Sequence, residues 1–421
     1  GGGGGGTTTG GTGGIGGGGG GGTVAGASAF GGGSGAAIAA GTGGSGGGGG
    51  AGLGGAVFVQ QGGFLTLSEL VPGSFALQGN STVPGAAGTG ATAGSPGRNL
   101  GDDFFIASGG TLTMGLAENF TISSSIASNE GAGGGYSATS GLAVAMASGK
   151  TLTLAGVNTY TGTTTISTGI LNVTADTALG SQGPLVTPTT ITFPLASTGT
   201  LQAGGVITSA RGITLSGPGI LDTPTGTSMS FSGTVSGAGK ITKTGPGSLK
   251  LSGTNSYGGG TDVQGGTLAF GGSSNSPLGT GTVSLFDGTT LQVASDFTGA
   301  GFIANALTFV APQNGQTTID AQGNARWSGL VSGTAPFNKT GPGTFTLTNA
   351  ANSFTGNVNI NGGTLGATVD HALGNLANQI FINGATLQAA GTFPTPRSIT
   401  LTGASNIEVL PTFTLTSTGI I

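Results

Sequence analysis

The sequence contains no cysteine, a single histidine (His371) and very few charged residues. The lack of cysteine excludes disulfides and thiolate metal sites, although it does not exclude export from the cell. Charged residues make up 5% of the chain, against about a quarter in typical globular domains. Solubility must therefore depend on hydroxyls, amides and exposed backbone. Such a surface is more typical of an extracellular structural protein than of a cytosolic enzyme.

The charge distribution and hydropathy argue against two kinds of partner. The nine Lys and Arg are scattered, and the net charge is −4. Nucleic-acid binding needs clustered cations, so we do not expect it. There is no run of about 18 apolar residues, so we expect no helical membrane span. The chain opens on GGGGGGTTTGG rather than on a secretory signal, and we expect it to begin after processing or partway into a larger product.

The 97 glycines are unevenly distributed, and the chain divides into regions of different amino-acid composition. Residues 1–55 are a low-complexity, glycine-rich segment, which can be a flexible linker or extended strands packed on a neighbour. Across residues 56–149, short alternations of apolar and polar residues around Gly-Gly pairs predict N-terminal turns of a β-solenoid. We expect a loop excursion near residues 79–97. Residues 150–421 form the repeated part of the chain.

A pattern of about 97 residues occurs three times across residues 150–421, and its first copy begins just before residue 150. Its most similar parts are residues 148–173, 243–270 and 339–367. Equivalent positions lie 97 or 96 residues apart, and they include Leu152, Leu249 and Phe345, followed by Tyr160, Tyr257 and Phe354. The last repeat is truncated, because Ile421 falls inside it, and we expect the natural protein to continue. A long repeat in one chain indicates a stack of similar units.

Apolar residues in the middle repeat occur in pairs two residues apart, such as Leu249 with Leu251 and Leu291 with Val293. This period places each pair on one face of a short strand. Short, one-sided strands need covering by similar strands, which a right-handed parallel β-helix with turns of roughly 20 to roughly 25 residues provides. Each repeat would then be four or five turns. An antiparallel sandwich of about 100 residues per domain is the competing fold, but the repeats follow one another without linkers.

The motifs of the middle repeat resemble a known family. The segment GPGSLKLSGTNSYGGGTDVQGGTLAF, followed by SPLGTGTVSLFDGTTLQV, closely resembles the passenger-associated strand repeat of bacterial autotransporters. DTALG and HALG carry the same element in the flanking repeats, and GGAVFVQQGGFLTL is similar to passenger sequence. The resemblance covers residues 54–421 and implies a secreted or surface-displayed parallel β-helix. We expect the family's C-terminal membrane barrel to lie outside these 421 residues.

The residue types that often perform chemistry are isolated in this sequence. His371 has Thr177 and Ser276 as its counterparts in the sister repeats, which indicates a surface loop. Asp102 and Asp103 are adjacent, and adjacent strand residues point to opposite faces, so a turn or a solvated edge is expected. The GKT at residues 149–151 lacks the glycine that a phosphate-binding loop needs five residues before its second glycine.

Other recurring polar residues are interpreted as structural. Asp222, Asp320 and Glu408 lie at nearly equivalent places but are four or five turns apart, so we expect exposed solubilising charges. Asn158, Asn255 and Asn352 are expected to shape the same turn in each repeat. The threonine pairs fit strands rather than an ice-binding face. No catalytic, cofactor-binding or metal-binding residue is predicted, and no cofactor is expected.

Two classes of function remain open from the sequence. The first is a non-enzymatic β-solenoid at the cell surface or secreted, acting as a stalk, an adhesin or an extracellular fibre subunit. Its partners would be host or matrix surfaces, or further copies stacked head to tail, with the glycine-rich segment covering a neighbour. The alternative is a carbohydrate-binding or polysaccharide-degrading β-helix protein. That alternative would need a site around residues such as Trp327 or Asp102.

Overall fold

The computed structural model describes residues 52–53, 57–68, 86, 99–100, 102–128, 140–181, 189–299, 301–310 and 316–421. Apart from residues 52–53 and 86, the glycine-rich segment 1–55 and the loop expected near 79–97 lie outside the described residues. The chain divides into two compact units, Gly1–Ile191 and Thr192–Ile421. Each unit is described by itself below.

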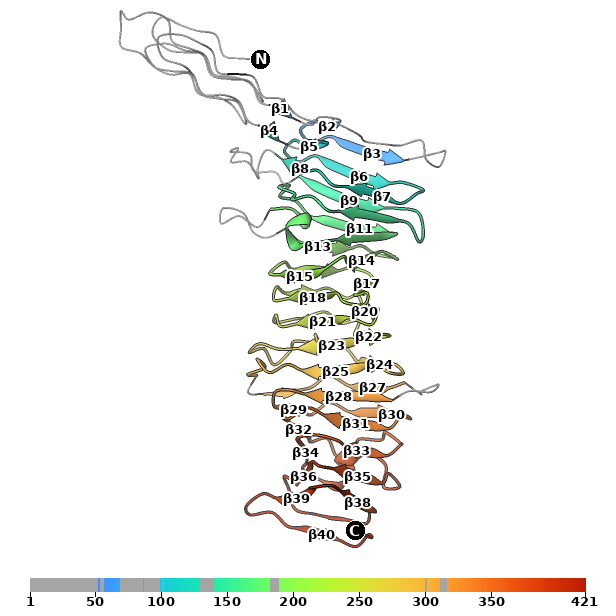
Figure 1. Ribbon diagram of the computed structural model, residues 1–421, viewed down its shortest axis with the longest axis vertical. Helices are drawn as coiled ribbons and strands as arrows, with labels where there is room; N and C mark the ends of the chain where they lie inside the picture. The colour runs from blue at the N-terminus through green and yellow to red at the C-terminus, as the bar shows by residue number, and fades with distance from the viewer. Residues whose placement is uncertain are drawn as a thin grey trace, which may run out of the picture. The chain divides into compact units, whose positions relative to one another are not determined.

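Unit 1 consists of short strands in parallel stacks, labelled in Figure 1. One stack contains β2 (Val57–Val59), β5 (Phe104–Ile106) and β8 (Ile126–Ser128). A second contains β3 (Phe64–Ser68), β6 (Thr111–Gly115), β9 (Gly141–Ala145) and β11 (Thr164–Thr168). A third contains β7 (Phe120–Ile122), β10 (Thr151–Leu154) and β12 (Ile170–Val173). The short strands β1 (Gly52–Leu53) and β4 (Asn99–Leu100) pair with each other, and η1 (Asp176–Leu179) is a 3₁₀ turn.

Unit 2 contains the strands that follow β13 (Ile191–Phe193), and these strands stack on three faces of a coil. Face 1 is one uninterrupted sheet of ten strands: β15 (Val206–Ser209), β18 (Ser228–Phe231), β21 (Ser248–Leu251), β23 (Thr267–Phe270), β25 (Thr290–Val293), β28 (Thr317–Ala321), β31 (Phe337–Thr340), β33 (Val358–Ile360), β35 (Ile380–Asn383) and β38 (Ile399–Thr402).

Faces 2 and 3 are each interrupted once in unit 2. Face 2 contains β16 (Ile213–Leu215) and β19 (Val235–Ser236), and then β26 (Phe302–Ile303), β29 (Ala325–Trp327), β32 (Thr344–Leu347), β34 (Thr364–Ala367), β36 (Thr386–Ala389) and β39 (Asn406–Val409). Face 3 contains β14 (Thr200–Ala203), β17 (Gly219–Asp222), β20 (Ile241–Thr244), β22 (Thr261–Val263), β24 (Val283–Leu285), β27 (Leu307–Phe309) and β30 (Val331–Gly333), and then β37 (Phe393–Thr395) and β40 (Leu415–Ser417).

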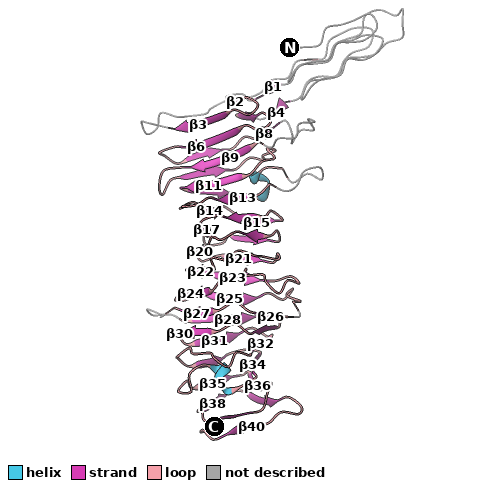
Figure 2. Cartoon of the chain, turned by 180° about the vertical axis from the view of Figure 1, so that it is seen from behind, coloured by secondary structure: helices cyan, strands magenta, loops and turns pink. Residues whose placement is uncertain are grey.

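The register between strands confirms the predicted parallel β-solenoid, and the antiparallel sandwich is wrong. Leu249 lies in register with Leu268, and Leu291 lies in register with Ile319 across a longer turn. Turn length therefore varies, while strand register stays in step because the loops absorb the difference. At the parallel strand spacing of about 4.8 Å, the ten strands of face 1 rise about 43 Å. Figure 2 shows the same stack from behind.

The core of unit 2 is a narrow apolar column inside the three faces. Inward residues of successive strands stack in register, and Leu249, Leu268 and Leu291 are all fully buried. Burying a side chain of this size contributes about 1.5 to 3 kcal/mol. Outward positions carry Thr, Ser and charged residues, as period-two alternation requires. The thin core thus follows directly from the pattern that the sequence analysis identified.

Aromatic side chains from all three faces meet in one part of this column. The Phe337 ring lies with its centroid 5.7 Å from that of Phe309, 5.8 Å from that of Phe354 and 6.5 Å from that of Phe345. Phe345 in turn lies 5.9 Å from Trp327. Offset and edge contacts of this kind stabilise beyond their buried area. The cluster therefore ties the three faces together inside the coil.

Some of the glycines are required because successive turns approach closely at the corners. A Cβ on Gly329 would lie 1.8 Å from the carbonyl oxygen of Asn305 in the preceding turn, and one on Gly253 would lie 2.3 Å from that of Gly233. Such contacts are sterically impossible, so these corners accept only glycine. Part of the glycine content therefore serves the stacking of turns.

The repeat is not a whole number of turns. Strand β21 of the middle repeat lies on face 1, whereas its counterpart β32 in the third repeat lies on face 2. The repeat therefore spans four turns and one third, where the sequence suggested four or five. The loops that interrupt a face also shift by one face from one repeat to the next. In the middle repeat, residues 252–260 and 271–282 replace strands on face 2. In the third repeat, residues 348–357 and 368–379 replace strands on face 3. Equivalent loops thus point about 120° apart around the coil, as a constant rotation per repeat produces.

Candidate functional site

The residues that the sequence analysis considered for chemistry are not brought together. His371 is exposed in the 3₁₀ turn η2 (Asp370–Leu373). Asp102 and Asp103 lie in a bend before β5, where the Ser124 hydroxyl donates to the Asp103 carboxylate. Within the described ranges, no three His, Asp or Glu side chains are grouped so that they could hold a metal ion.

The three recurring acids lie on three different faces. Asp222 is on β17 of face 3, Asp320 on β28 of face 1 and Glu408 on β39 of face 2. They share no site, as the sequence analysis expected. Asp222 and Asp320 are nevertheless not simply solvated, since each accepts a hydrogen bond from a glutamine amide, at 2.8 and 2.7 Å. Each also accepts one from a threonine hydroxyl on the next turn.

Trp327 cannot act as a sugar-stacking residue. Its side chain is 0% exposed and lies between the Phe270 and Phe345 rings, at centroid distances of 6.4 and 5.9 Å. Stacking on a sugar requires an exposed ring face. The carbohydrate-binding alternative, as the sequence placed it at Trp327, is therefore wrong.

The interrupted faces are held by buried asparagines with the same role in each repeat. The Asn255 side-chain oxygen accepts from the Val235 N–H at 2.7 Å, and its amide donates to the Pro277 carbonyl at 2.5 Å. Asn158 and Asn352 make the corresponding two bonds in their own repeats. One side chain thus links three successive turns where no strand continues the ladder. This satisfies backbone groups that would otherwise be buried without partners.

A second buried pair changes in a correlated way between repeats. The Tyr257 hydroxyl lies 2.7 Å from the Thr261 hydroxyl, and residues 160 and 164 repeat this pair at 2.8 Å. In the third repeat, Phe354 and Val358 occupy the same two positions. Removing both polar partners together avoids leaving one hydroxyl buried and unsatisfied. The signal was present in the sequence as a change at two positions four residues apart.

Two lysines are buried in cages of backbone carbonyls, which the sequence analysis missed. Lys243 donates from Nζ to the carbonyls of Thr244, Gly245 and Gly265 at 2.7, 2.8 and 3.0 Å. Lys339 makes the equivalent three bonds in the next repeat. All three ammonium donors are therefore satisfied. The recurrence of KTGPG was the available signal.

Burial of these two lysines shifts their protonation. Burial lowers the pKa of both Lys243 and Lys339 to about 8, although the nearby carboxylates of Asp222 and Asp320, respectively, oppose the shift. The first repeat has Met146, also buried, at the equivalent position. The cage therefore tolerates an apolar side chain of similar length, so the charge is not essential to the fold.

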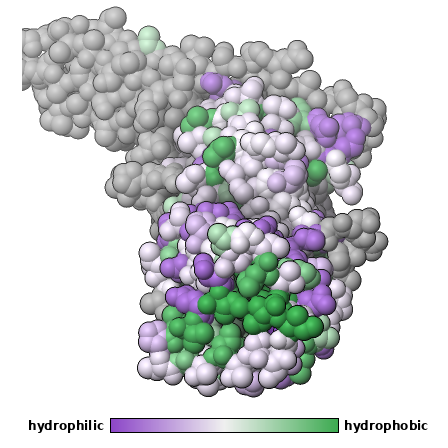
Figure 3. All heavy atoms as spheres, turned by 60° about the horizontal axis from the view of Figure 1, so that its bottom comes forward, coloured by the Kyte–Doolittle hydropathy of each residue, from purple (hydrophilic) through white to green (hydrophobic). Residues whose placement is uncertain are grey.

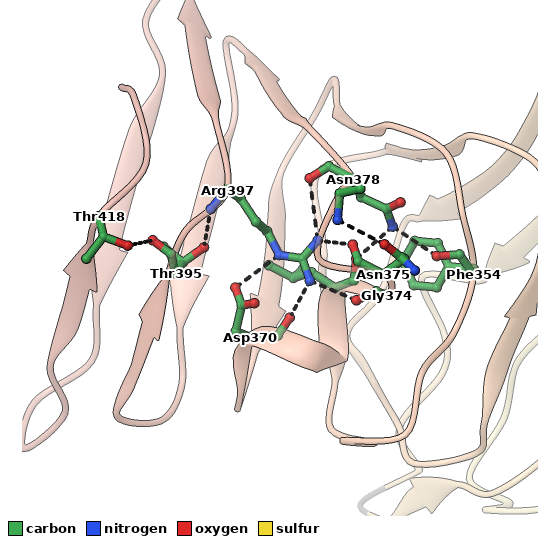
Figure 4. A network of polar contacts seen from close by, with 10 residues as sticks. Phe354, Asp370, Gly374, Asn375, Asn378, Thr395, Arg397 and Thr418 are labelled. Atoms are coloured by element: carbon green, nitrogen blue, oxygen red, sulfur yellow. Dashed lines mark hydrogen bonds and ion pairs between the residues drawn. The ribbon is translucent and has the colours of Figure 1, made fainter.

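The most extensive polar network surrounds Arg397, which is fully buried just before β38 (Figure 4). Its Nε donates to the Asp370 carboxylate at 3.0 Å. Its two terminal nitrogens donate to the carbonyls of Asn375, Asp370 and Gly374 at 2.5, 3.1 and 2.8 Å. One guanidinium thereby fixes the whole 370–378 loop of the preceding turn. A planar group with five donors is suited to several carbonyls at once.

In the middle repeat, two neutral amide side chains hold the equivalent loop by hydrogen bonds. Asn305 stands at the position of Arg397, and its amide donates to the carbonyls of Leu278, Gly279 and Gly281 at 3.3, 3.2 and 2.7 Å. Asn275 stands at the position of Asp370 and accepts from a backbone N–H at 2.9 Å. The acid and the arginine are thus exchanged together for two amides. This exchange cannot be recognised in the sequence, because its partners belong to different turns.

Comparison with known proteins agrees with this architecture. The Passenger-associated-transport-repeat family matches residues 149–173, 241–270 and 337–367. The chain is 34% identical over 284 residues to the "Adhesin BmaC autotransporter" of Brucella suis biovar 1 (strain 1330). The alignment covers 61% of this chain and 8% of that relative, so the chain spans only a small part of the relative's length. No solved structure matches.

A parallel β-solenoid with cross-turn clamps at each interrupted face belongs to the class of repetitive β-solenoid proteins. The repeats, the related adhesin and the fold are those of an autotransporter passenger domain, which lies outside the cell or on its surface. In the part of the chain that the structure describes, no helix is long and apolar enough to cross a membrane.

The Arg397 network predicts a specific coupling between two residues. Asp370→Asn leaves a buried guanidinium without its countercharge, and Arg397→Asn leaves a buried carboxylate, so each should destabilise unit 2 by about 3 to 5 kcal/mol. The double variant restores the Asn/Asn pair of the middle repeat and should cost at least about 1 kcal/mol less than the sum. Urea unfolding of the four proteins measures this. His371→Asn, at the exposed neighbour, is the control, and strictly additive effects would contradict the coupling.

The caged lysines predict a rise in stability above neutral pH. Between pH 8 and the ordinary lysine pKa of 10.5, the unfolded chain binds more protons than the folded one, so the free energy of unfolding increases with pH. Burial also raises the pKa of Tyr257, which opposes this effect only above about pH 10. Urea midpoints at pH 7.5 and 9.5 should differ in the parent protein. The difference should vanish when both lysines are replaced by methionine, the residue at position 146, and an unchanged difference would refute the assignment.

Proposed function

We propose that this chain is a non-enzymatic, rigid section of a surface-displayed β-solenoid that acts as an adhesive stalk. The observation that carries the proposal is the unbroken parallel register of face 1 from β15 to β38. Each turn contacts its neighbours, so a ladder of this kind distributes stability along the axis of the coil. The clamps by Asn255, Asn352 and Arg397 keep the coil in register where the other two faces are interrupted.

The use of the polar side chains supports a mechanical role rather than catalysis. Lys339 and Arg397 direct their donors to backbone carbonyls inside the coil, where no substrate could reach them. Catalytic groups are typically found converging in an accessible pocket with a partner that activates them. The buried charges of unit 2 instead hold loops in place.

An adhesive role is supported by the related adhesin and by the geometry of the repeats. The relative is named as an adhesin, and the alignment with it covers 61% of this chain. The rotation by a third of a turn per repeat presents equivalent loops in different directions around unit 2. A stalk of this design can meet a host or matrix surface from several sides, which favours multivalent attachment.

Head-to-tail stacking is part of the proposal. Figure 3 shows apolar side chains gathered at the C-terminal end of unit 2. Leu401, Val409, Phe413, Ile420 and Ile421 are exposed there. In this sequence, β38, β39 and β40 are the last strands of their sheets, and the next turn of the solenoid, from this chain or from a second copy, would pair with them. Open edges recruit further strands unless they are covered, and a second copy offers strands of the same period. The proposal gives the glycine-rich residues 1–55 the role of covering such a neighbour.

The proposal is tested with the purified chain on beads. Beads carrying the chain should attach to cultured epithelial cells or matrix-coated surfaces well above albumin-coated beads, and the chain should release no reducing ends from a panel of polysaccharides. Sedimentation should show association that Phe413→Lys with Ile420→Lys weakens, while Leu195→Lys, at another exposed position of unit 2, does not. Absence of attachment would overturn the adhesive role, and sugar release would overturn the non-enzymatic one. A chain that sediments as a monomer would overturn stacking alone.

A further inference from the structure

The outer side of face 2 carries a hollow that the repeat architecture does not explain. It has a volume of about 350 Å³ and lies over β26, β29 and β32. Its lining includes Gly299, Gly301, Asn324, Arg326, Thr344 and Thr346. These are a cation, an amide, two hydroxyls and bare backbone, which together form a polar site open to solvent.

The strand register brings three different side chains side by side, and two of them, Arg326 and Thr346, line this hollow. Phe302 pairs with Arg326, and Arg326 pairs with Thr346, so the three form one outward row across neighbouring strands. The flanking Ala325 and Trp327 point inward and are buried. The Arg326 guanidinium carbon lies 4.6 Å from the centroid of the Phe302 ring, and that ring remains 46% exposed. The aromatic ring therefore fixes the cation in place at the surface.

Arg326 is unusual among the cations of unit 2. Lys240 and Lys250 pair with acids at 2.9 and 2.6 Å, and Lys339 and Arg397 are buried with full sets of acceptors. No carboxylate among the described residues pairs with Arg326, which is exposed. Its guanidinium donates to none of the described residues, so its N–H groups are available to a ligand.

The neighbouring amide is also poised to donate outward. The Asn324 side-chain oxygen accepts from the Thr344 N–H at 2.7 Å, which fixes the orientation of the amide. Among the described residues, its NH₂ group has no acceptor, so both N–H donors are available at the rim of the hollow. The amide and the guanidinium thus lie beside Thr344, whereas Thr346 is only 7% exposed.

An insertion specific to the middle repeat builds one wall of the hollow. The stretch from Val293 to Asn305 is longer than the equivalent stretch from Ala389 to Arg397 in the third repeat. Within the inserted part, Phe297 packs edge-on against Phe270 at 5.1 Å, which anchors it to the core. The third repeat lacks these extra residues, so the hollow is an addition to the architecture.

We propose that this hollow binds a carboxylated sugar residue of a glycan. The planar Arg326 guanidinium would pair with the carboxylate through two parallel hydrogen bonds. Asn324 and the Thr344 hydroxyl would bond to sugar hydroxyls, and the exposed part of the Phe302 ring, beside the hollow, offers an apolar surface of the kind that ligand sites commonly include. A single guanidinium without further cations matches one carboxylate better than a phosphate group. The proposal rests on the proposed display of the chain at the cell surface and names a ligand class for one place on it.

The test compares acidic and neutral oligosaccharides by calorimetry on the purified full chain. The probes are sialyl-lactose, a glucuronate-terminated hyaluronan tetrasaccharide, and lactose. At least one acid should bind at least about tenfold more tightly than lactose, as expected for a hydrogen bond to a charged group in place of a neutral one. Arg326→Gln should remove this preference, and Phe302→Ala should weaken the binding of the acid. Lys240→Gln, at a half-buried position paired with Asp262, and Phe64→Ala, at an exposed position elsewhere in the chain, should leave it unchanged.

Each outcome decides the proposal. Binding of the sialyl probe alone identifies a sialylated cell-surface glycan, binding of the hyaluronan probe alone identifies a matrix polysaccharide, and binding of both identifies the carboxylate as the shared feature. Equal binding of lactose and the acids, or an Arg326→Gln variant that binds like the parent, overturns the proposal, as does a sulfated lactose that binds more tightly than both acids. If the beads attach to cells but the acids do not bind, this site fails while the adhesive role stands. Matching unfolding midpoints show that the variants are folded.

Discussion

Unit 2 depends on one constraint: the backbone ladder between successive parallel turns must stay in register while the length of the turns varies. Face 1 meets this constraint with ten strands in one sheet. Where faces 2 and 3 lose their strands, side chains take over the hydrogen bonding, through Asn255, Asn352 and Arg397. The polar residues of the core thus serve the backbone, because a buried carbonyl or N–H without a partner is costly.

The repeats preserve this bonding while exchanging the chemistry that provides it. The pair Asp370 and Arg397 is replaced by two asparagines in the middle repeat. In the same way, the Tyr–Thr pair of the first two repeats becomes Phe–Val in the third. Changes occur in pairs because altering one partner alone leaves a buried donor, acceptor or charge uncompensated. Arg326 and Asn324 differ from these buried groups, since they lie exposed at the hollow on face 2.

The rotation of the repeat links this architecture to the proposed adhesive role. A repeat of four turns and one third places equivalent loops on successive faces of unit 2. A feature added to one repeat, such as the insertion beside Phe302, is therefore displayed in its own direction. Stacked units of this kind can carry different surface features around one rigid ladder, and the core need not change.

The sequence alone determined the strands, the parallel coil, the repeat and the resemblance to passenger domains. Period-two alternation is local, so residues such as Leu249 and Leu251 reveal their burial without knowledge of their neighbours in space. Only the tertiary structure decided which residues meet across turns. Asp370 and Arg397 are 27 residues apart, and Phe302 meets Arg326 only because the loop between their strands sets the register. The burial of Trp327 was likewise invisible, since an aromatic residue in a strand can face either side until that register is known.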